Sequence, residues 1–515
     1  MSKGKLLAVC CVWLLVLGIG VLVWRAVFVP ARQTALKRQQ AEEAARQERE
    51  REEERQRGGS KSRYVETVDF RLDSFSGYAV LRSETFRQQL SEKQIRLNLH
   101  DDGADYLARI KALKSGEADL AAFTVDALIK VCAETGDLPA TIVAVIDETT
   151  GADAIVAYKE TVPNVDALNR PDMRFVLTPN SPSETLARVV MSRFNLDRLA
   201  EKPFVEVAGV EEVVRKYTES KPADPAAYVL WEPSVSQVLQ NPAMHAVVDS
   251  SRFPAAIVDV IVASDDFVTK SPRVLRDFVE SYLRAVYAYR ERSELIKLVL
   301  DDARRAGAPL KEEQASKLVD GIWWKNTQEN LAHVGLLPEH GLPHLEDIIA
   351  DITEVLLSTG GIARDPTDGQ PSFLYFSQVL EELRDFHPGA EAESVRQVRL
   401  PSLTDAQWEK LTTVGTARVP ALVFARGTDQ LTELSRAVLD DLAQKLKTTR
   451  YYVIIRGNAA KVGDPEQNKL LAQRRAKAAE QYLIGQGVDV NRIRAVGTEP
   501  SGETSVSFVL GQLPY

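Results

Sequence analysis

Cysteine is scarce in this sequence, and its scarcity limits the cross-links that the chain could form. Three cysteines occur among 515 residues. Cys10 and Cys11 lie in an apolar stretch near the N-terminus, so Cys132 is alone in the rest of the chain. No disulfide is expected there, which fits an exported protein that does without disulfides and equally a cytosolic protein. The six histidines show no spacing typical of metal ligands, so we expect no metal site and no cofactor.

Excess positive charge and catalytic motifs are also lacking. The net charge is −9, and without a broad basic field no nucleic acid partner is expected. The sequence contains no Walker loop, no nucleophile elbow and no metal cluster, which argues against an enzyme. The hydrophobic and charged fractions, 44% and 27%, are ordinary for globular domains. A chain of this length is expected to form two to four domains.

One long apolar run is present at residues 6–24, LLAVCCVWLLVLGIGVLVW, with no charged residue, proline or amide. A hydrocarbon core about 30 Å thick requires roughly 20 apolar residues in a helix, so this run is long enough to span a membrane. A cleaved signal peptide would have a shorter run and a small-residue cleavage site. A lipoprotein would have a small residue before its cysteine, whereas Val9 precedes Cys10. We therefore predict an uncleaved anchor, with residues 1–31 as cytoplasmic tail and transmembrane helix.

The flanking charges leave the orientation of this anchor open. Lys3 and Lys5 precede it, and four basic residues follow it by position 38. This asymmetry favours a cytoplasmic C-terminal side, although the rule weakens for long translocated domains. Residues 32–62 are rich in Arg, Lys, Glu, Gln and Ala and end in GGSKS. They predict a solvated helical spacer with a flexible Gly/Ser joint.

From residue 64 onward, strand and helix patterns alternate. Residues 65–70 and 95–99 predict strands, and residues 140–146 predict a buried strand. Residues 78–90 and 105–114 predict helices between them. This order predicts an α/β fold with a mostly parallel sheet and helices on both faces. In such sheets ligands bind beyond the carboxyl ends of the strands.

Four short segments then occur in a familiar order: DSFSGYAV at 73–80, LKSGEADL at 113–120, TTGADAIVA at 149–157 and LWEP at 230–233. This succession resembles the type II periplasmic solute-binding proteins of ABC importers. The branch for nitrate, sulfonates, taurine and thiamine precursors is most similar, and phosphate-binding proteins come next. The resemblance implies a domain over residues 63–400 with two α/β lobes, lobe two at about 160–250. It also implies a return strand within 255–263 and helices at 272–291 and 312–326 that pack on lobe one.

The resemblance implies a ligand cleft between the lobes, lined by polar turns. Turns at which strands give way to helices suit a polar or anionic ligand through hydroxyls and backbone N–H groups. Capping of the helix N-termini alone would explain the same serines, and Trp231 would serve equally as a core residue or as a ligand platform. The candidate ligand-binding residues are Ser74, Ser76, Gly77, Tyr78, Thr149, Thr150, Ser181, Ser183 and Trp231. The acidic pair usual before the Trp motif is replaced here by DPAAY at residues 224–228.

A different pattern begins near residue 419. Strands are predicted at 421–424, 451–455 and 505–510, and helices at 430–447 and 465–485. This region, residues 401–515, resembles the OmpA C-terminal, peptidoglycan-associated domain. The residues in register with that family are Gly457, Gly463, Asn468, Leu471, Arg475, Ala476, Gly487, Val488, Gly497, Glu499 and Pro500.

The resemblance implies a site for the diaminopimelate of peptidoglycan, to which Asn468 and Arg475 correspond. The family holds this amino acid with an Asp and an Arg, but Ala460 occupies the Asp position and Ala459 the preceding Thr position. Without the acid, the ammonium group of the peptide loses its counter-charge. Asp464 is a possible replacement, and Arg475 would equally be an ordinary surface arginine. We expect weak peptidoglycan binding.

Both resemblances belong to the cell envelope outside the cytoplasmic membrane. We therefore predict a single-pass inner-membrane protein whose C-terminal domains lie in the periplasm. Its predicted function is to capture a small polar or anionic solute, with the OmpA-like domain positioning it against the wall or an envelope membrane protein. The alternative is a non-enzymatic envelope scaffold in which both binding sites are degenerate.

Overall fold

The computed structural model describes residues 64–337, 342–389, 394–396, 400–458, 463–497 and 506–513. Residues 1–65 and 66–515 are separate units, and every element below belongs to the second. The predicted anchor, spacer and joint lie outside the described residues. Among the helices that are described, none has the length and apolar character needed to cross a membrane.

The first lobe is built on a six-stranded sheet. Its strands are β1 (Glu66–Leu72), β2 (Ile95–Asp101), β3 (Leu120–Thr124), β4 (Ala140–Thr149), β10 (Val258–Ser264) and β11 (Ile322–Trp324), in the spatial order β11-β4-β10-β3-β1-β2. β1 is parallel to β2 and β3, whereas β10 is antiparallel to β3 and β4, and β11 to β4. The prediction of a mostly parallel sheet is therefore wrong. β10 re-enters the sheet at the end where β3 and β4 leave it, which makes the sheet mixed.

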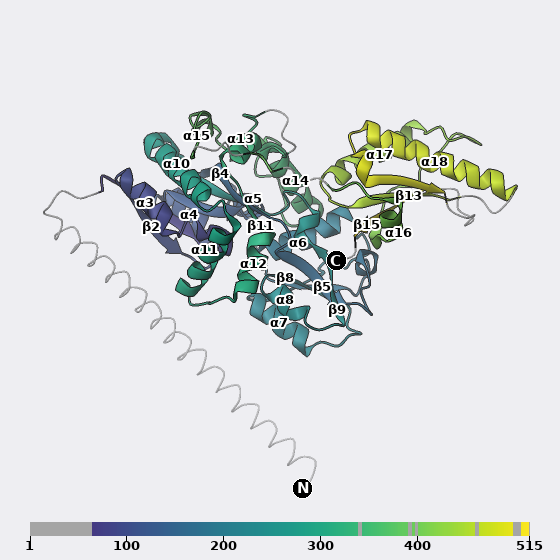
Figure 1. The fold of residues 1–515 in the computed structure, drawn as a ribbon, viewed down its shortest axis with the longest axis horizontal. Helices are drawn as coiled ribbons and strands as arrows, with labels where there is room; N and C mark the ends of the chain where they lie inside the picture. Colours follow the sequence, from purple (N-terminus) through teal and green to yellow (C-terminus); the bar gives the residue numbers. More distant parts are fainter. Residues whose placement is uncertain are drawn as a thin grey trace, which may run out of the picture. The chain divides into compact units, whose positions relative to one another are not determined.

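Helices cover both faces of this sheet (Figure 1). One face packs against α3 (Glu84–Glu92), α10 (Pro272–Ala288), α11 (Arg292–Arg305) and α12 (Glu312–Gly321). There Phe278 stacks on Phe70 at 5.7 Å and meets the Phe86 ring edge-on at 5.2 Å. The other face packs against α4 (Tyr106–Ser115), α5 (Val125–Thr135) and α14 (Leu345–Ser358). Shorter helices α9 (Asp265–Lys270), α13 (Thr327–His333) and α15 (Gln378–Glu381) complete the lobe.

Two predicted helices differ from those observed. The helix predicted at 78–90 is divided into a 3-10 turn η2 (Ser76–Ala79) and α3. Ser83 separates them, because its hydroxyl caps α3 by accepting a hydrogen bond from the Phe86 N–H at 3.1 Å. The helix predicted at 312–326 ends at Gly321, and β11 follows with Trp323 and Trp324 buried against the core.

The second lobe is a five-stranded sheet formed by the chain between β4 and β10. Its strands are β5 (Asp153–Tyr158), β6 (Arg174–Leu177), β7 (Phe204–Glu206), β8 (Ala226–Trp231) and β9 (Met244–Asp249), in the order β7-β6-β8-β5-β9. The long helix α6 (Pro182–Arg193) covers one face. The shorter α7 (Val210–Glu219) and α8 (Ser234–Val238) cover the other.

The chain passes between the two sheets twice, from β4 to β5 and from β9 to β10. The crossings are bonded to each other and to lobe one. The Thr149 N–H donates to the Ile257 carbonyl at 3.0 Å, and the Thr150 N–H to the Gly321 carbonyl at 2.7 Å. The Gly151 N–H donates to the Ser250 hydroxyl at 2.9 Å. The structure thus has the two α/β lobes and the two crossings that the sequence predicts.

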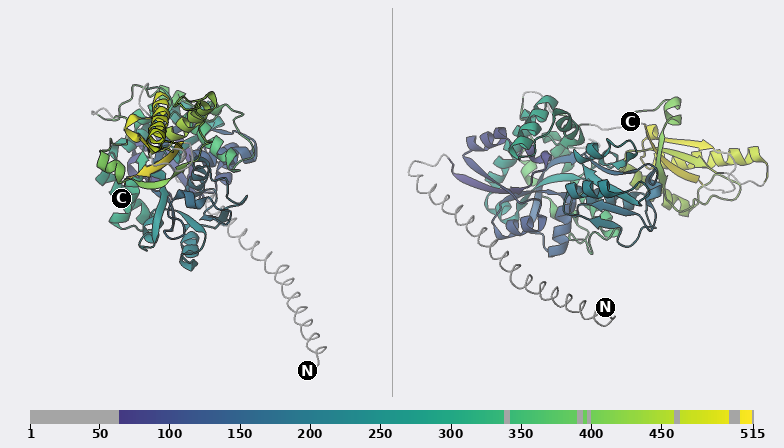
Figure 2. Two further views of the ribbon diagram at one scale, coloured as in Figure 1. Left: turned by 90° about the vertical axis from the view of Figure 1, so that its right-hand side faces the viewer. Right: turned by 90° about the horizontal axis from the view of Figure 1, so that it is seen from below.

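A four-stranded sheet forms the C-terminal module. Its strands are β12 (Thr412–Ala417), β13 (Tyr452–Gly457), β14 (Ile493–Gly497) and β15 (Val506–Gln512), in the order β12-β15-β13-β14, with helices α16 (Asp405–Glu409), α17 (Glu433–Lys447) and α18 (Pro465–Gly485). α17 and α18 lie side by side on one face of the sheet (Figures 1 and 2). The strand predicted at 421–424 is not one; Phe424 makes only an isolated bridge to Leu431. The edge strand is β12 instead, which the apolar pattern missed because residues 412–417 are mostly Thr, Gly and Ala.

The C-terminal module shares an apolar core with the α6 face of lobe two. Tyr451 meets the rings of Phe194 and Phe253 edge-on, at 6.0 and 6.1 Å between centroids. The Arg450 N–H donates to the Arg252 carbonyl at 2.6 Å. These contacts bring the start of β13 next to the crossing that follows β9.

Candidate functional site

Side chains from the two lobes meet directly at the N-termini of α5 and α6. Lys130 of α5 forms an ion pair with Glu184 of α6 at 2.9 Å, and the Thr185 hydroxyl donates to the Asp126 carboxylate. Glu184 also accepts from Arg188 Nε at 2.7 Å and from the Asn180 N–H at 2.7 Å. Burial opposes the ionisation of Glu184, yet Lys130 and Arg188 hold its pKa below the ordinary value. The lobes are therefore joined by charged contacts that opening would expose to water.

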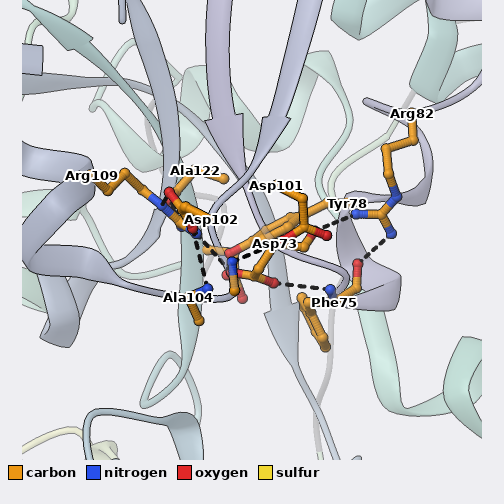
Figure 3. A network of polar contacts seen from close by, with 11 residues as sticks. Asp73, Phe75, Tyr78, Arg82, Asp101, Asp102, Ala104, Arg109 and Ala122 are labelled. Carbon is orange, nitrogen blue, oxygen red and sulfur yellow. Dashed lines mark hydrogen bonds and ion pairs between the residues drawn. The ribbon is translucent and has the colours of Figure 1, made fainter. Parts of the chain in front are cut away.

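A buried arginine organises the polar turn that follows β1 (Figure 3). Arg109 of α4 is fully buried. It donates to Asp73 at 3.1 Å and to Asp102 at 2.8 Å, and also to the Ala122 carbonyl. Asp73 in turn accepts from the Phe75 N–H at 2.9 Å. The single guanidinium is thus committed to two carboxylates and a carbonyl, and the turn at residues 73–78 is fixed in place.

Four further carboxyl groups are buried where β3, β4, β5 and β10 end or begin at the lobe boundary. They are Asp126, Asp147, Asp153 and Asp259, exposed by 2%, 0%, 3% and 1%. Asp147 and Asp259 are opposite each other in the β4–β10 pairing, and Asp259 accepts from the Tyr78 hydroxyl. Asp126, Asp153 and Asp259 each have one side-chain oxygen without a hydrogen-bond partner. Asp147 faces the Asp259 carboxyl closely enough for a side-chain hydrogen bond between them, which opposes the rise in the pKa of Asp147. Buried polar atoms are rarely left without partners, and a few other buried groups of the core, such as His333 and Thr353, share this state.

Burial shifts the titration of all four carboxyls in the same direction. Desolvation raises the pKa of Asp147 to about 7 and that of Asp153 to about 7, the latter with a contribution from Asp126. Burial also raises the pKa of Asp126, and burial together with the nearby Asp147 raises that of Asp259. Perturbed carboxyls gathered at one boundary are typical of functional sites.

A buried ion pair lies beside this cluster. Lys325, which follows β11, donates to Glu148 at 2.7 Å, and both side chains are at most 2% exposed. Glu148 also accepts from the Ala255 N–H at 2.9 Å, in the second crossing, and Arg450 of the C-terminal module lies 3.7 Å away. Burial opposes the ionisation of Glu148, but Lys325 and Arg450 hold its pKa below the ordinary value. This pair is internally satisfied, unlike the neighbouring aspartates.

The predicted ligand-binding residues occupy different parts of this boundary. In lobe one, Ser74 is exposed, Ser76 is half-buried, and Gly77 and Tyr78 are buried; Tyr78 alone bonds to the carboxyl cluster. The Gly77 carbonyl accepts from Trp324 Nε1 at 2.7 Å. Thr149 and Thr150 serve the crossing through their backbone N–H groups.

In lobe two the predicted residues lie at the start of α6 and the end of β8. The Ser181 hydroxyl donates to the Thr178 carbonyl at 2.6 Å and makes no side-chain cap. The Ser183 hydroxyl is fully buried without a hydrogen-bond partner. Trp231 is half-buried and opposite Asp153 in the β5–β8 pairing. The binding roles of these residues remain predictions.

Sequence reasoning missed the four aspartates. A detectable signal was present, because Asp259 interrupts the apolar run AAIVDVIVA and Asp147 follows AVI within a buried strand. A charged residue inside an apolar strand is costly unless it has a purpose. The spatial grouping depends on the strand order and could not be obtained from the run of residues.

A cavity of about 490 Å³ is lined by both lobes beside the Lys130–Glu184 pair, and none of the four aspartates is among its lining residues. Tyr106, Ala127 and Lys130 line it from lobe one, and Pro179 and Asn180 from lobe two. Burial raises the pKa of Tyr106, and the nearby charges of Asp73 and Asp126 raise it further. The cavity is of the size of small-molecule pockets. Within the residues that the structure describes, no group of His, Cys, Asp and Glu has the arrangement of a metal site.

In the C-terminal module, Arg475 is half-buried at the side of α18. Its Nε donates to the Thr428 carbonyl at 2.9 Å, and its guanidinium lies 4.9 Å from the Phe424 ring centre. Burial lowers the pKa of Arg475. Asn468 lies on the same helix. Asp464 caps α18 by accepting from the Glu466 and Gln467 N–H groups. Ala459 and Ala460 lie outside the described residues.

The protein thus has two adjoining α/β lobes with buried ionisable groups at their boundary, and a small module with both strands and helices follows them. Residues 423–504 match the model of the OmpA family. No curated protein matches the chain.

Similar solved structures include a putative sulfonate ABC transporter protein, the periplasmic sulfonate-binding protein SsuA from Methylobacillus flagellatus. Its sequence identity is 12% and the TM-score is 0.48, and the alignment covers 64% of this chain and 98% of that chain. The periplasmic aliphatic sulphonate binding protein SsuA from Escherichia coli has 12% sequence identity and a TM-score of 0.44, and the alignment covers 66% of this chain and 98% of that chain. The ligand-binding component of an ABC-type import system from Staphylococcus aureus has 13% sequence identity and a TM-score of 0.44, and the alignment covers 62% of this chain and 98% of that chain.

Proposed function

We propose that this protein captures a small solute between its two lobes and is held in the cell envelope, where the OmpA-like module positions it. The observation that carries this proposal is the boundary itself. Two sheets joined by two crossings bring buried ionisable side chains of both lobes together next to a cavity of about 490 Å³. Hinged lobes around a polar site are suited to reversible capture. No step of this proposal requires covalent chemistry.

Solute capture can be tested on the purified full-length protein. Small molecules released on denaturation would be identified by mass spectrometry, and a library of charged and neutral solutes would be screened by thermal shift. A solute at 100 times its dissociation constant adds about 2.7 kcal/mol to the stability, which is readily measured. If no occupant is released and no solute in the library stabilises the protein, the proposal is wrong.

A second candidate function is an envelope scaffold whose lobes do not open. The direct bonds between the lobes, from Lys130 to Glu184 and from Thr185 to Asp126, favour it. Small-angle X-ray scattering with and without a stabilising solute distinguishes the two. Capture predicts a change in the shape of the protein, whereas a scaffold predicts none.

A further inference from the structure

The charges at the lobe boundary do not balance. Among the described residues, the ion pairs include none of the four buried aspartates Asp126, Asp147, Asp153 and Asp259, although the charges of Lys130 and Lys325 act on Asp126 and Asp147. Arg109 is bonded to Asp73 and Asp102, and Lys130 and Lys325 are paired with Glu184 and Glu148. The other titratable groups that contact the site or lie beside it are Asp73, Tyr78, Tyr106, Arg109, Lys130, Glu148, Glu184, Tyr282 and Lys325.

Unpartnered atoms mark the same place independently of the charge count. The Tyr282 hydroxyl of α10 is fully buried and has no hydrogen-bond partner, and it lies near enough to Asp147 and Asp259 for both to affect its titration. The Ser183 hydroxyl, buried at the start of α6, likewise has no partner. Oxygens left over on four carboxyls accept hydrogen bonds, and the hydroxyls accept or donate them. A ligand with several N–H donors would satisfy them together.

We propose that the solute captured between the lobes is an organic cation with ammonium or guanidinium groups, bound by Asp126, Asp147, Asp153 and Asp259. This inference rests on the proposed capture function and names the class of solute for that site. A sulfonate or phosphate would place its charge among buried carboxyls, where like charges interact strongly because little water screens them. The structure therefore favours a cationic ligand, whereas the sequence suggested a polar or anionic one.

Binding of a cation should be accompanied by the release of protons. Burial raises the pKa of both Asp147 and Asp153 to about 7, so a fraction of each carboxyl is still protonated at neutral pH. A bound ammonium group favours their ionised forms, so both give up protons as the cation enters. The observable consequence is affinity that increases as the pH rises from 6 to 8.

The test uses the full-length protein and matched pairs of probes. Putrescine and succinate have the same four-carbon length and opposite charge, and agmatine and ethanesulfonate extend the two sets. Choline carries a positive charge without an N–H donor. We expect putrescine or agmatine to raise the melting temperature and to release protons, as measured by calorimetry in buffers of different ionisation enthalpy. Succinate and ethanesulfonate should have no effect, and choline should bind more weakly than the amines.

Variants locate the site and separate the outcomes. Asp147→Asn and Asp153→Asn keep the shape and remove the charge, and each should weaken amine binding at least about tenfold. Asp172→Asn, an exposed carboxyl of lobe two paired with Arg170, is the control and should change nothing. If Asp147→Asn does not fold, Asp153→Asn and proton release by the unaltered protein still decide the question.

Four results are possible. Amine binding that both variants lose supports the proposal. Amine binding that they retain overturns the assignment of the site. Binding of succinate or ethanesulfonate alone overturns the cation but leaves solute capture intact. Binding of neither set, together with no molecule released on denaturation, overturns both the cation and the capture function.

Discussion

At the scale of single residues, the buried aspartates make the stability of the solute-free protein depend on pH. The pKa of Asp147 is about 7 in the folded chain, against an ordinary value of 3.8. The folded state therefore binds more protons than the unfolded state between about pH 4 and pH 7, and the stabilising contribution present at low pH is lost as the pH rises through 7. Asp153 acts in the same direction.

We therefore predict that Asp147→Asn is more stable than the unaltered protein at about pH 7 and nearly equal to it at about pH 3.5. The difference in melting temperature, measured at half-unit steps of pH, should grow steadily between these values. Asp172→Asn should follow the unaltered protein throughout. A difference independent of pH would mean that Asp147 does not titrate in this range.

The pair of Lys325 and Glu148 supports a second prediction at this scale. Both side chains are buried and 2.7 Å apart, so Lys325→Met leaves an uncompensated charge and should cost about 3–5 kcal/mol in unfolding free energy. Adding Glu148→Gln should recover much of the loss. Lys270→Met, which breaks an exposed pair with Asp266, should cost at most about 1 kcal/mol. Equal losses in urea denaturation for Lys325→Met and the double variant would contradict this explanation.

Arg475 gives a third prediction. Arg475 is already engaged with the Thr428 carbonyl and the Phe424 ring, and the family's acidic partner is replaced by Ala460. We expect little sedimentation of the protein with purified peptidoglycan, and a clear gain for the double change Ala459→Thr and Ala460→Asp. Strong sedimentation of the unaltered protein that Arg475→Ala abolishes would show that another group supplies the acid.

At the scale of elements, the contact between β13 and α18 depends on one glycine. A Cβ at Gly457 would lie 2.0 Å from the carbonyl oxygen of Ala472, a backbone atom that cannot move without shifting α18. Gly457→Ala should therefore cost about 3 kcal/mol or more in the stability of the C-terminal module. Gly485→Ala, at the end of the same helix, meets nothing within 4 Å and should be neutral or slightly stabilising. Thermal unfolding followed by circular dichroism compares the two variants.

The sequence predicted elements better than it predicted the site. Apolar periodicity located β1, β2, α4, α17 and α18 to within a few residues, because each carries its own apolar face, whereas α10 was expected from the family resemblance. It failed at β12, whose Thr, Gly and Ala residues form a strand only because β15 lies beside them. The prediction missed the carboxyl cluster for the same reason, because the cluster depends on which strands lie side by side. Asp126 and Asp259 are 133 positions apart in number (259 − 126), and only the pairing of β3 with β10 brings them near each other.

At the scale of the whole molecule, the proposed location can be tested directly. The OmpA match at residues 423–504 and the apolar run at residues 6–24 motivate it. A reporter fused after Tyr515 that is active only outside the cytoplasmic membrane should be active, and a reporter active only in the cytoplasm should be silent. The opposite pair of results would reject both the location and a role at the cell wall.

Glu148 gives the molecule a further property. Its carboxylate joins Lys325 in lobe one, Ala255 in the second crossing and, at 3.7 Å, Arg450 in the C-terminal module. Arg450 interacts with the Glu148 carboxylate, so a rotation of one lobe that moves Ala255 changes the electrostatic environment of Arg450. Thermodynamic coupling of this kind is reciprocal. If an occupant between the lobes changes the affinity of the C-terminal module for its partner, that partner changes the affinity of the lobes for the occupant by the same factor. The C-terminal module would then regulate the binding site as well as position the protein, and binding of the module's partner would change how readily the solute is released.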